Sequence, residues 1–409
     1  MARVLILSVG GSQEPVINAC REYEPDFIYF FCSGGKQASS VVVDETKESI
    51  VNSLGISKED CGVRYDKVVV EDPDDLELCY RTLKDLQKEV ERRFGEETEV
   101  IANYTGGTKT MSVALAVAAL LNARWQLSLN KGPRVDLVKV RGGDLPVLTD
   151  KTEFSLEFCL AQVRNFLGRY EYDAAEKLLA QVTRHQYLSR DQEQRVLRWR
   201  RLCQAFFAWD IFDHKRALTL LRSSPSRAVE PFINALLDIT GASRGATGYE
   251  KVLDLLYNAG RRALQSRHDD AVARLYRAVE LLAQTRLKQK WEIETGKVEL
   301  DKIPEGVREF YRNLQGGEEK LQLGLRNAYR LLADLGDEVG KIWQEREKTL
   351  LSALEKRNYS ILAHGTEPVG EEDYRKWSQV YEDFINNALS FLGIRTRCLQ
   401  LPREELLEM

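Results

Sequence analysis

The chain has 409 residues, of which 43% are hydrophobic and 30% are charged, and its formal net charge is −4. This balance is typical of a folded globular protein with two or three domains, and it excludes a globally basic nucleic-acid binder but not a local basic groove. No apolar run is long enough for a membrane span or a signal peptide. The seven cysteines form no Cys-x-x-Cys and have no histidine at metal spacing. We therefore expect reduced thiols, a cytoplasmic location and no metal site.

Residues 1–150 alternate short apolar runs with helical patterns, which predicts a Rossmann-like α/β domain with a mostly parallel sheet. The predicted strands are 4–9, 27–32, 68–70, 100–103, 125–129 and 135–140, and the predicted helices are 13–21, 76–94 and 111–122. Ser12 is the expected N-cap of the first helix. The helix 111–122 is apolar on all sides, so we expect it to be buried.

Three glycine-rich turns follow predicted strands: Gly10-Gly11-Ser12, Ser33-Gly34-Gly35 and Thr105-Gly106-Gly107-Thr108-Lys109. Ligands of open parallel sheets bind at the carboxyl ends of the strands, where glycines let the backbone approach and helix N-termini attract phosphates. The turns therefore predict a site for a phosphorylated, nucleotide-like ligand. The Walker A and dinucleotide-binding patterns are both absent. The alternative is that the glycines only allow tight strand-to-helix turns.

The stretches Leu7–Ser12 and Asn103–Met111 resemble the CARF domain, the sensor of type III CRISPR-associated proteins. The resemblance implies a homodimer that binds a cyclic oligoadenylate on its two-fold axis, with the tetra-adenylate favoured over the hexa-adenylate on family grounds. Lys109 would neutralise a phosphate, or would be a solvated lysine at a helix start. The ligand-contact candidates carried over are Ser8, Gly10, Gly11, Ser12, Ser33, Thr105, Gly106, Gly107, Thr108 and Lys109.

From residue 151 onward the pattern is helical, which predicts an all-α half made of a connector, 151–245, and a second domain, 246–409. Trp199 and Trp209 are interpreted as hairpin core rather than as a base-stacking surface. Arg277 and Glu280 are interpreted as an ordinary i,i+3 ion pair. We expect a polar loop at 306–317 and a frayed tail at 401–409. His185, His214 and His268 share no motif and are expected at the surface.

The segment Arg357–Gly365 follows a strong helical pattern and contains one of only four histidines. Arg357 and His364 are seven positions apart, so they share one side of a continuous helix. Gly365 is the expected helix stop. The alternative interpretation is a surface arginine with a capping histidine.

The motif Arg357-Asn358 with Ala363-His364-Gly365 resembles the Arg-x(4–6)-His motif of HEPN ribonucleases. The resemblance implies metal-independent RNA cleavage, in which the 2′-hydroxyl attacks the adjacent phosphorus and leaves a 2′,3′-cyclic phosphate. Arginine could clamp the developing negative charge, histidine could move the proton, and Asn358 could orient the substrate or His364. The two side chains would lie about 10 Å apart along the axis, and HEPN domains resolve this by pairing two motifs across a dimer.

These motifs together predict a CARF–HEPN protein: a cyclic-oligoadenylate-activated endoribonuclease that cuts single-stranded RNA in type III CRISPR defence. A ring nuclease that uses Lys109, Thr105 and Thr108 to degrade its own activator is the second hypothesis. An oligoadenylate-binding protein with an inactive helical domain is the third. The base preference at the cut does not follow from the sequence.

Overall fold

The computed structural model describes residues 2–35, 38–122, 124–132, 134–135, 139–140, 144–185, 188–316, 318–358, 365–395 and 398–409. The chain forms two compact units. The N-terminal unit comprises Met1–Ala161 and Gln181–Arg190, and the helical unit comprises Gln162–Ala180 and Asp191–Met409. The division passes through three consecutive helices between residues 152 and 210. The domain boundaries expected after residues 150 and 245 stay a prediction.

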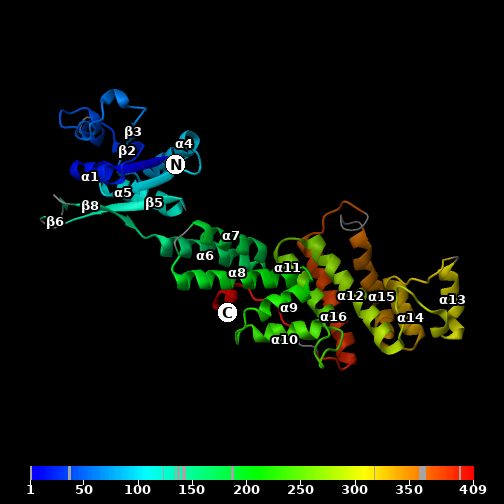
Figure 1. Ribbon diagram of the computed structural model, residues 1–409. Coiled ribbons are helices and arrows are strands. Elements are labelled where there is room, and N and C mark those ends of the chain that lie inside the picture. Colours follow the sequence, from blue (N-terminus) through cyan, green and yellow to red (C-terminus); the bar gives the residue numbers. More distant parts are fainter. Residues whose placement is uncertain are drawn as a thin grey trace. The chain divides into compact units, whose positions relative to one another are not determined.

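The N-terminal unit alternates strands and helices along the chain (Figure 1). Its elements are β1 (Arg3–Ser8), α1 (Glu14–Tyr23), β2 (Phe27–Ser33), α2 (Ser39–Asp44), α3 (Ile50–Ser53), η1 (Lys58–Asp60), β3 (Tyr65–Val70), α4 (Leu76–Phe94), β4 (Glu99–Asn103), α5 (Lys109–Leu121), β5 (Trp125–Lys131), β6 (Arg134–Val135), β7 (Lys139–Val140) and β8 (Leu145–Thr149).

The six-stranded sheet has the order β3-β2-β1-β4-β5-β8. The first five strands are parallel, and β8 pairs antiparallel with β5. The predicted Rossmann-like sheet is therefore confirmed, whereas β8 was not predicted. The strand order reverses between β1 and β4, so the turns after these two strands meet at the point where open α/β sheets bind ligands.

Side chains alternate between the two faces of the sheet. Val4 and Ile6 of β1 pack into one core with α4 and α5, whereas Leu5 and Leu7 pack into a second core with α1 and α3. Period-two alternation with apolar residues on both faces is what a central parallel strand requires.

Two expectations about this unit were wrong. Ser12 does not cap α1, because the N-cap is Gln13 and no side chain caps this end. Helix α5 is not buried on all sides, because Val113 and Leu121 keep 49% and 47% of their surface exposed. An apolar helix is thus covered by the sheet on one side only.

The chain's remaining helices belong to the helical unit, which begins within the first of them, except for the parts of the first three that fall in the N-terminal unit. These are α6 (Thr152–Gly168), α7 (Tyr172–His185), α8 (Arg190–Asp210), α9 (His214–Arg222), α10 (Glu230–Ile239), α11 (Glu250–Leu264), α12 (His268–Trp291), η2 (Leu300–Lys302), α13 (Glu305–Gln315), α14 (Leu325–Asp334), α15 (Glu338–Asn358), α16 (Glu371–Phe391) and η3 (Glu404–Glu408).

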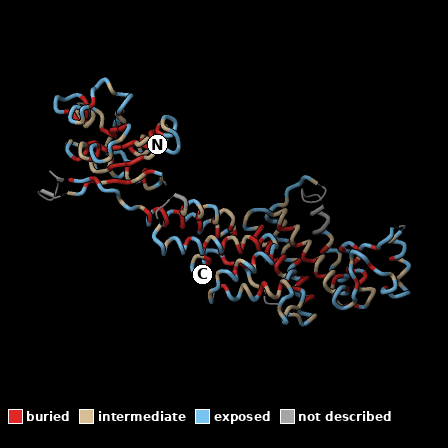
Figure 2. The backbone as a smooth tube through the Cα atoms, viewed as in Figure 1, coloured by how far each residue is buried: buried red, intermediate tan, exposed pale blue. Residues whose placement is uncertain are grey.

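A continuous apolar core runs through α11, α12, α14, α15 and α16 (Figure 2). Trp343 of α15 stacks on Tyr329 of α14 with ring centroids 4.1 Å apart, and Phe384 of α16 meets both rings edge-on. Trp199 and Trp209 of α8 are buried, which confirms them as core residues. None of the helices in the described part of the chain is long and apolar enough to span a membrane.

Three further expectations about the helical unit were wrong. Residues 306–317 are not a loop, because α13 covers Glu305–Gln315. The C-terminal tail is ordered: Leu406 is buried, and Trp199 Nε1 donates to the Leu407 carbonyl at 2.8 Å. His214 is only 6% exposed and contacts Asp254. In contrast, the ordinary ion pair between Arg277 and Glu280 is present at 2.8 Å.

Candidate functional site

The turns that follow β1 and β4 are built against one another. Ser8 and Ser112 both donate their hydroxyl groups to the Gly106 carbonyl, at 2.6 and 2.7 Å. A Cβ atom on Gly10 would lie 2.7 Å from the Gly107 amide nitrogen, and one on Gly106 would overlap the Ser8 carbonyl oxygen. These two glycines are therefore required by backbone-to-backbone packing, whatever binds outside.

Helix α5 begins at the end of the second turn. Thr108 is its N-cap and accepts from the Met111 N–H, while its hydroxyl also donates to the Pro73 carbonyl at 2.7 Å. Lys109 is the first residue of the helix and is exposed. The helix N-terminus and the lysine both present positive charge at this edge of the sheet.

A cavity of about 240 Å³ opens beside these turns. Five of the predicted residues line it: Gly10, Gly11, Ser33, Gly107 and Thr108. The other five predicted residues, Ser8, Ser12, Thr105, Gly106 and Lys109, do not line it. Five lining residues were not predicted: Val9, Ala38, Ser39, Val42 and Met111.

The Ser33 turn is tied to α2. The Ser39 N–H donates to Ser33 Oγ at 3.0 Å, and the Ser33 N–H donates to Ser39 Oγ at 2.9 Å. This reciprocal pair explains why Ser39 lines the cavity together with Ser33. The pair Ser39-Ser40 before a run of three valines is the signal that could have indicated a helix start here, because serine is common at such positions.

A buried polar network supports the second turn from behind. The Thr105 hydroxyl donates to Asn130 Oδ1 at 3.2 Å and accepts from the Asn130 N–H at 2.7 Å. Asn130 Nδ2 in turn donates to Asp144 Oδ2 at 2.6 Å, and Asn103 donates to Asn130. Thr105 therefore positions the turn, and its hydroxyl is already engaged.

The Arg-His motif lies at the end of α15. Arg357 and Asn358 are the last two residues of that helix, and nothing is described of their side chains. His364 lies outside the described residues. The predicted meeting of Arg357, Asn358 and His364 therefore stays a prediction.

The described residues on both sides of the motif are firmly held. Asp337, just before α15, is fully buried and accepts from Arg286, Lys290 and Trp291 of α12 at 3.0–3.2 Å. Burial opposes its charge, but these donors together hold the pKa of Asp337 below its usual value. After the motif, the Val369 N–H donates to the Asp269 carboxylate at 3.3 Å. Both ends of the segment are thus anchored to α12.

Comparison with known proteins identifies the helical unit. Residues 244–388 match the family model of the Csm6 HEPN domain. This part of the chain is therefore similar to the HEPN domain of Csm6. The predicted resemblance to CARF–HEPN proteins of type III CRISPR systems is thereby confirmed.

The fold of the whole chain also has a solved counterpart. It is similar to Enterococcus italicus Csm6 bound to cyclic hexa-2′-fluoro-hexa-dAMP, with a TM-score of 0.63 and 13% identity over 97% of this chain and 96% of that one. At this identity the similarity establishes a shared Csm6 fold. No curated protein matches the sequence. Among the described residues, no group of three His, Cys, Asp or Glu side chains could hold a metal ion.

Proposed function

We propose that this CARF–HEPN protein is a metal-independent endoribonuclease that cuts single-stranded RNA after a cyclic oligoadenylate binds its N-terminal unit. The observation that carries the proposal is the cavity formed by the glycine turns and the N-terminus of α5, in a chain that also has a Csm6 HEPN domain. The expected product ends in a 2′,3′-cyclic phosphate.

The pocket chemistry supports an oligoadenylate as ligand. Gly10, Gly11 and Gly107 offer bare backbone beside the cavity, and the N-terminus of α5 at its edge would attract a ligand phosphate. Lys109 does not line the cavity, but it would neutralise a phosphate of a ligand that extends beyond the cavity. The solved relative holds a cyclic hexa-adenylate analogue. We still expect the tetra-adenylate to activate this chain, and the two rings have to be tested separately.

The ribonuclease chemistry is assigned to the motif at the end of α15. The planar guanidinium of Arg357 would clamp the non-bridging oxygens of the scissile phosphate, and the His364 imidazole would move the proton. Asn358 would orient the substrate or His364. All three residues lie within the part of the chain that matches the HEPN family model.

The exposed stripe of α5 supports a homodimer. Val113, Val117 and Leu121 recur every fourth residue, so they line one face of the helix, and each keeps at least 36% of its surface exposed. Lys109 lies four residues before Val113 on the same face. An isologous contact through this stripe would bring two Lys109 side chains and two cavities to one axis, as a two-fold symmetric ring requires.

The internal hydrogen bonds do not favour a ring nuclease. The Thr105 and Thr108 hydroxyl groups already donate to Asn130 and to the Pro73 carbonyl. Neither hydroxyl is available as a nucleophile or as a proton donor without breaking these bonds. The cavity is therefore better equipped to hold a ligand than to cleave it.

A fluorescent single-stranded RNA assay tests the proposal. The RNA is incubated with the protein in EDTA, alone, with cyclic tetra-adenylate and with cyclic hexa-adenylate. Cleavage should require a ring, persist in EDTA and leave 2′,3′-cyclic phosphate ends detectable by mass spectrometry. If neither ring triggers cleavage, the activator is wrong; if EDTA abolishes it, the metal-free mechanism is wrong.

A further inference from the structure

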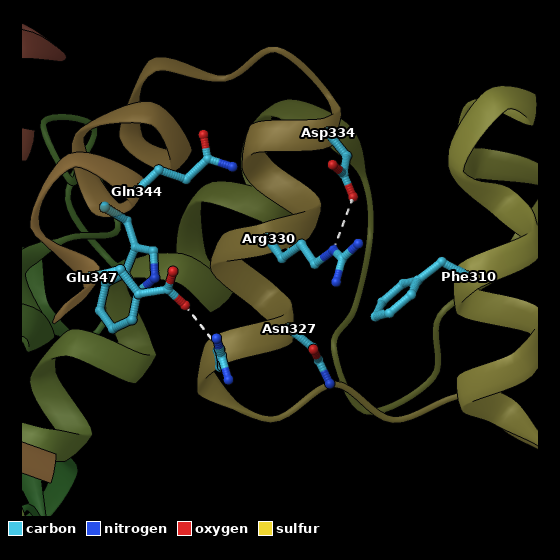
Figure 3. A pocket seen from close by; sticks show the side chains of 8 residues that line it. Phe310, Asn327, Arg330, Asp334, Gln344 and Glu347 are labelled. Carbon is cyan, nitrogen blue, oxygen red and sulfur yellow. Dashed lines mark hydrogen bonds and ion pairs between the residues drawn. The ribbon is translucent and has the colours of Figure 1, made fainter. Parts of the chain in front are cut away.

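A second, larger cavity lies in the helical unit, between α13, α14 and α15 (Figure 3). Its volume is about 500 Å³, within the range of small-ligand sites. Phe310 of α13 forms one side, Gln344 and Glu347 of α15 form the opposite side, and Arg330 of α14 extends between them. The cavity thus has walls from three helices that are anchored in one core.

Two amide side chains in this cavity have no hydrogen-bond partner in the part of the chain that the structure describes. Asn327 and Gln344 both line it, and neither makes a side-chain hydrogen bond to any described residue. Each amide presents a donor and an acceptor side by side. The Watson–Crick edge of a nucleobase presents the complementary pair, which makes the two amides suited to base recognition.

The charges in the cavity cancel. Arg326 pairs with Glu347 at 2.8 Å, and Arg330 lies 3.9 Å from Asp334, which also accepts from the Tyr311 hydroxyl at 2.6 Å. Two cations balanced by two carboxylates would repel a cluster of phosphates as much as attract it. The balance therefore favours the neutral base of a nucleotide over its phosphate groups.

The two carboxylates also discriminate among bases. Each carboxylate contacts these partners through a single oxygen, Oε1 of Glu347 and Oδ2 of Asp334. The second oxygen of each remains an acceptor without a donor among the described residues. Adenine, cytosine and guanine each carry an exocyclic amino group that can donate to a carboxylate, whereas uracil carries none and presents two carbonyl oxygens.

Flat surfaces complete the site. The Arg330 guanidinium lies over the Phe310 ring at 3.6 Å, and the buried Trp343 indole forms part of the wall. Stacking on aromatic rings and on guanidinium planes is how proteins hold the unpaired bases of RNA. Glu347 is ten residues before Arg357 on α15, which is about 15 Å along the helix axis. A few nucleotides of extended single strand span that distance.

We propose that this cavity binds one unpaired base of the RNA substrate that carries an exocyclic amino group, such as adenine or cytosine, a few nucleotides from the bond that is cut. The inference rests on the proposed ribonuclease function, which it extends by naming a specificity site. Asn327 and Gln344 read the base edge, Arg330 with Phe310 supplies the stacking surface, and Glu347 with Asp334 accepts from the amino group.

Cleavage of three labelled twelve-nucleotide strands, oligo(A), oligo(C) and oligo(U), tests the assignment. The double variant Asn327→Ala/Gln344→Ala should lower kcat/KM for oligo(A) and oligo(C) roughly tenfold. It should leave the value for oligo(U) within about twofold, because uracil is not read there. The matched control, Gln379→Ala/Asn387→Ala, removes two exposed amides of α16 and should leave kcat/KM unchanged on all three strands. Unchanged rates on oligo(A) and oligo(C), or an equal loss on all three strands, would overturn the inference.

A binding measurement separates this inference from the proposed function. Fluorescence anisotropy of the same strands is recorded with the His364→Ala protein, with and without the two cavity substitutions. Weaker binding of oligo(A) and oligo(C), but not of oligo(U), supports the cavity even if no ring triggers cleavage. Equal binding of all strands by both proteins, or no binding at all, overturns it even if the enzyme cuts RNA.

Discussion

The imidazole Nε2 of His214 and the carboxylate of Asp254 lie 2.8 Å apart in the interior of the helical unit. Asp254 also accepts from the Trp209 indole at 3.1 Å and lies 3.5 Å from the Arg261 guanidinium. Arg261 is itself fully buried and donates to Asp210 at 2.7 Å. This cluster joins α8 and α9 of the expected connector to α11 of the HEPN region.

Removing the central carboxylate should destabilise the helical unit. Asp254→Ala leaves the His214 imidazole and the Trp209 indole N–H without their partner in a dry site and removes one of the two carboxylates beside Arg261, which together cost roughly 3–5 kcal/mol. Urea unfolding should detect the loss as a lower midpoint. The exposed Asp383→Ala on α16 is the control and should stay within about 0.5 kcal/mol of the wild type. Equal midpoints for the two variants would show that the cluster contributes no net stability.

Because of Lys151, the free energy of unfolding should change with pH in the alkaline range. Its Nζ donates to the carbonyls of Ala119 and Asn122 at the end of α5, at 2.7 and 2.5 Å. Burial lowers the pKa of Lys151 to about 8 from 10.5. Between these values the unfolded chain holds more protons than the folded one, so this group adds stability as pH rises.

The comparison with Lys151→Met isolates that contribution. The wild type should gain stability relative to the variant from pH 8 to pH 10, on the order of 3 kcal/mol at most. Urea unfolding at pH 7, 8, 9 and 10 measures the difference. Lys88→Met, which removes a side chain that is 75% exposed, should show no such trend. A flat difference for Lys151→Met would mean that the buried amine keeps an ordinary pKa.

Two glycines, Gly106 of the turn after β4 and Gly11 of the turn after β1, should separate the effect of folding from that of ligand contact. Gly106→Ala forces a methyl group against the Ser8 carbonyl and should cost roughly 1–3 kcal/mol, with loss of ring binding. The methyl group added by Gly11→Ala would have no atom within 4 Å, but it would stand in the lining of the cavity. The free energy of unfolding should therefore stay the same while the affinity for the ring falls. Thermal melting and calorimetric titration with each ring report the two quantities. Full ring affinity in Gly11→Ala would exclude close backbone contact at that position.

Charges on the α5 stripe should break the proposed homodimer. Val113→Glu/Val117→Glu places two carboxylates in an apolar contact, so sedimentation equilibrium should show a monomer and ring-triggered cleavage should be lost. The control, Val63→Glu/Leu76→Glu, charges two exposed apolar residues elsewhere in the same unit, 71% and 49% exposed. It should remain dimeric. A dimeric, active stripe variant would move the interface to another surface.

Arg357→Ala and His364→Ala should each lower ring-triggered RNA cleavage roughly 10²–10⁴-fold, because the clamp or the proton carrier is missing. Calorimetric ring affinity should stay unchanged. Arg357→Lys keeps the charge but loses the bidentate geometry, so it should remain strongly impaired. If cleavage persists in both alanine variants, the catalytic residues lie elsewhere in the HEPN domain.

Local patterns determined much of this protein. Apolar runs that end in glycine turns predicted the parallel sheet, because strand length and turn chemistry are local properties. The Thr105–Lys109 turn and the Arg357–His364 spacing led to the CARF–HEPN resemblance. The Gly10 and Gly107 turns could be placed together from the sequence, because neighbouring parallel strands end at the same edge.

Only the tertiary structure decided which side chains are already engaged. The Ser8, Thr105 and Thr108 hydroxyl groups had appeared free for a ligand, yet each bonds to a group at least 25 residues away in sequence. His214 became a core residue because α11 brings Asp254 beside it, and the α5 stripe became exposed because the sheet covers one side of the helix. Long-range packing assigns each polar group its partner, and no window of a few residues contains that information.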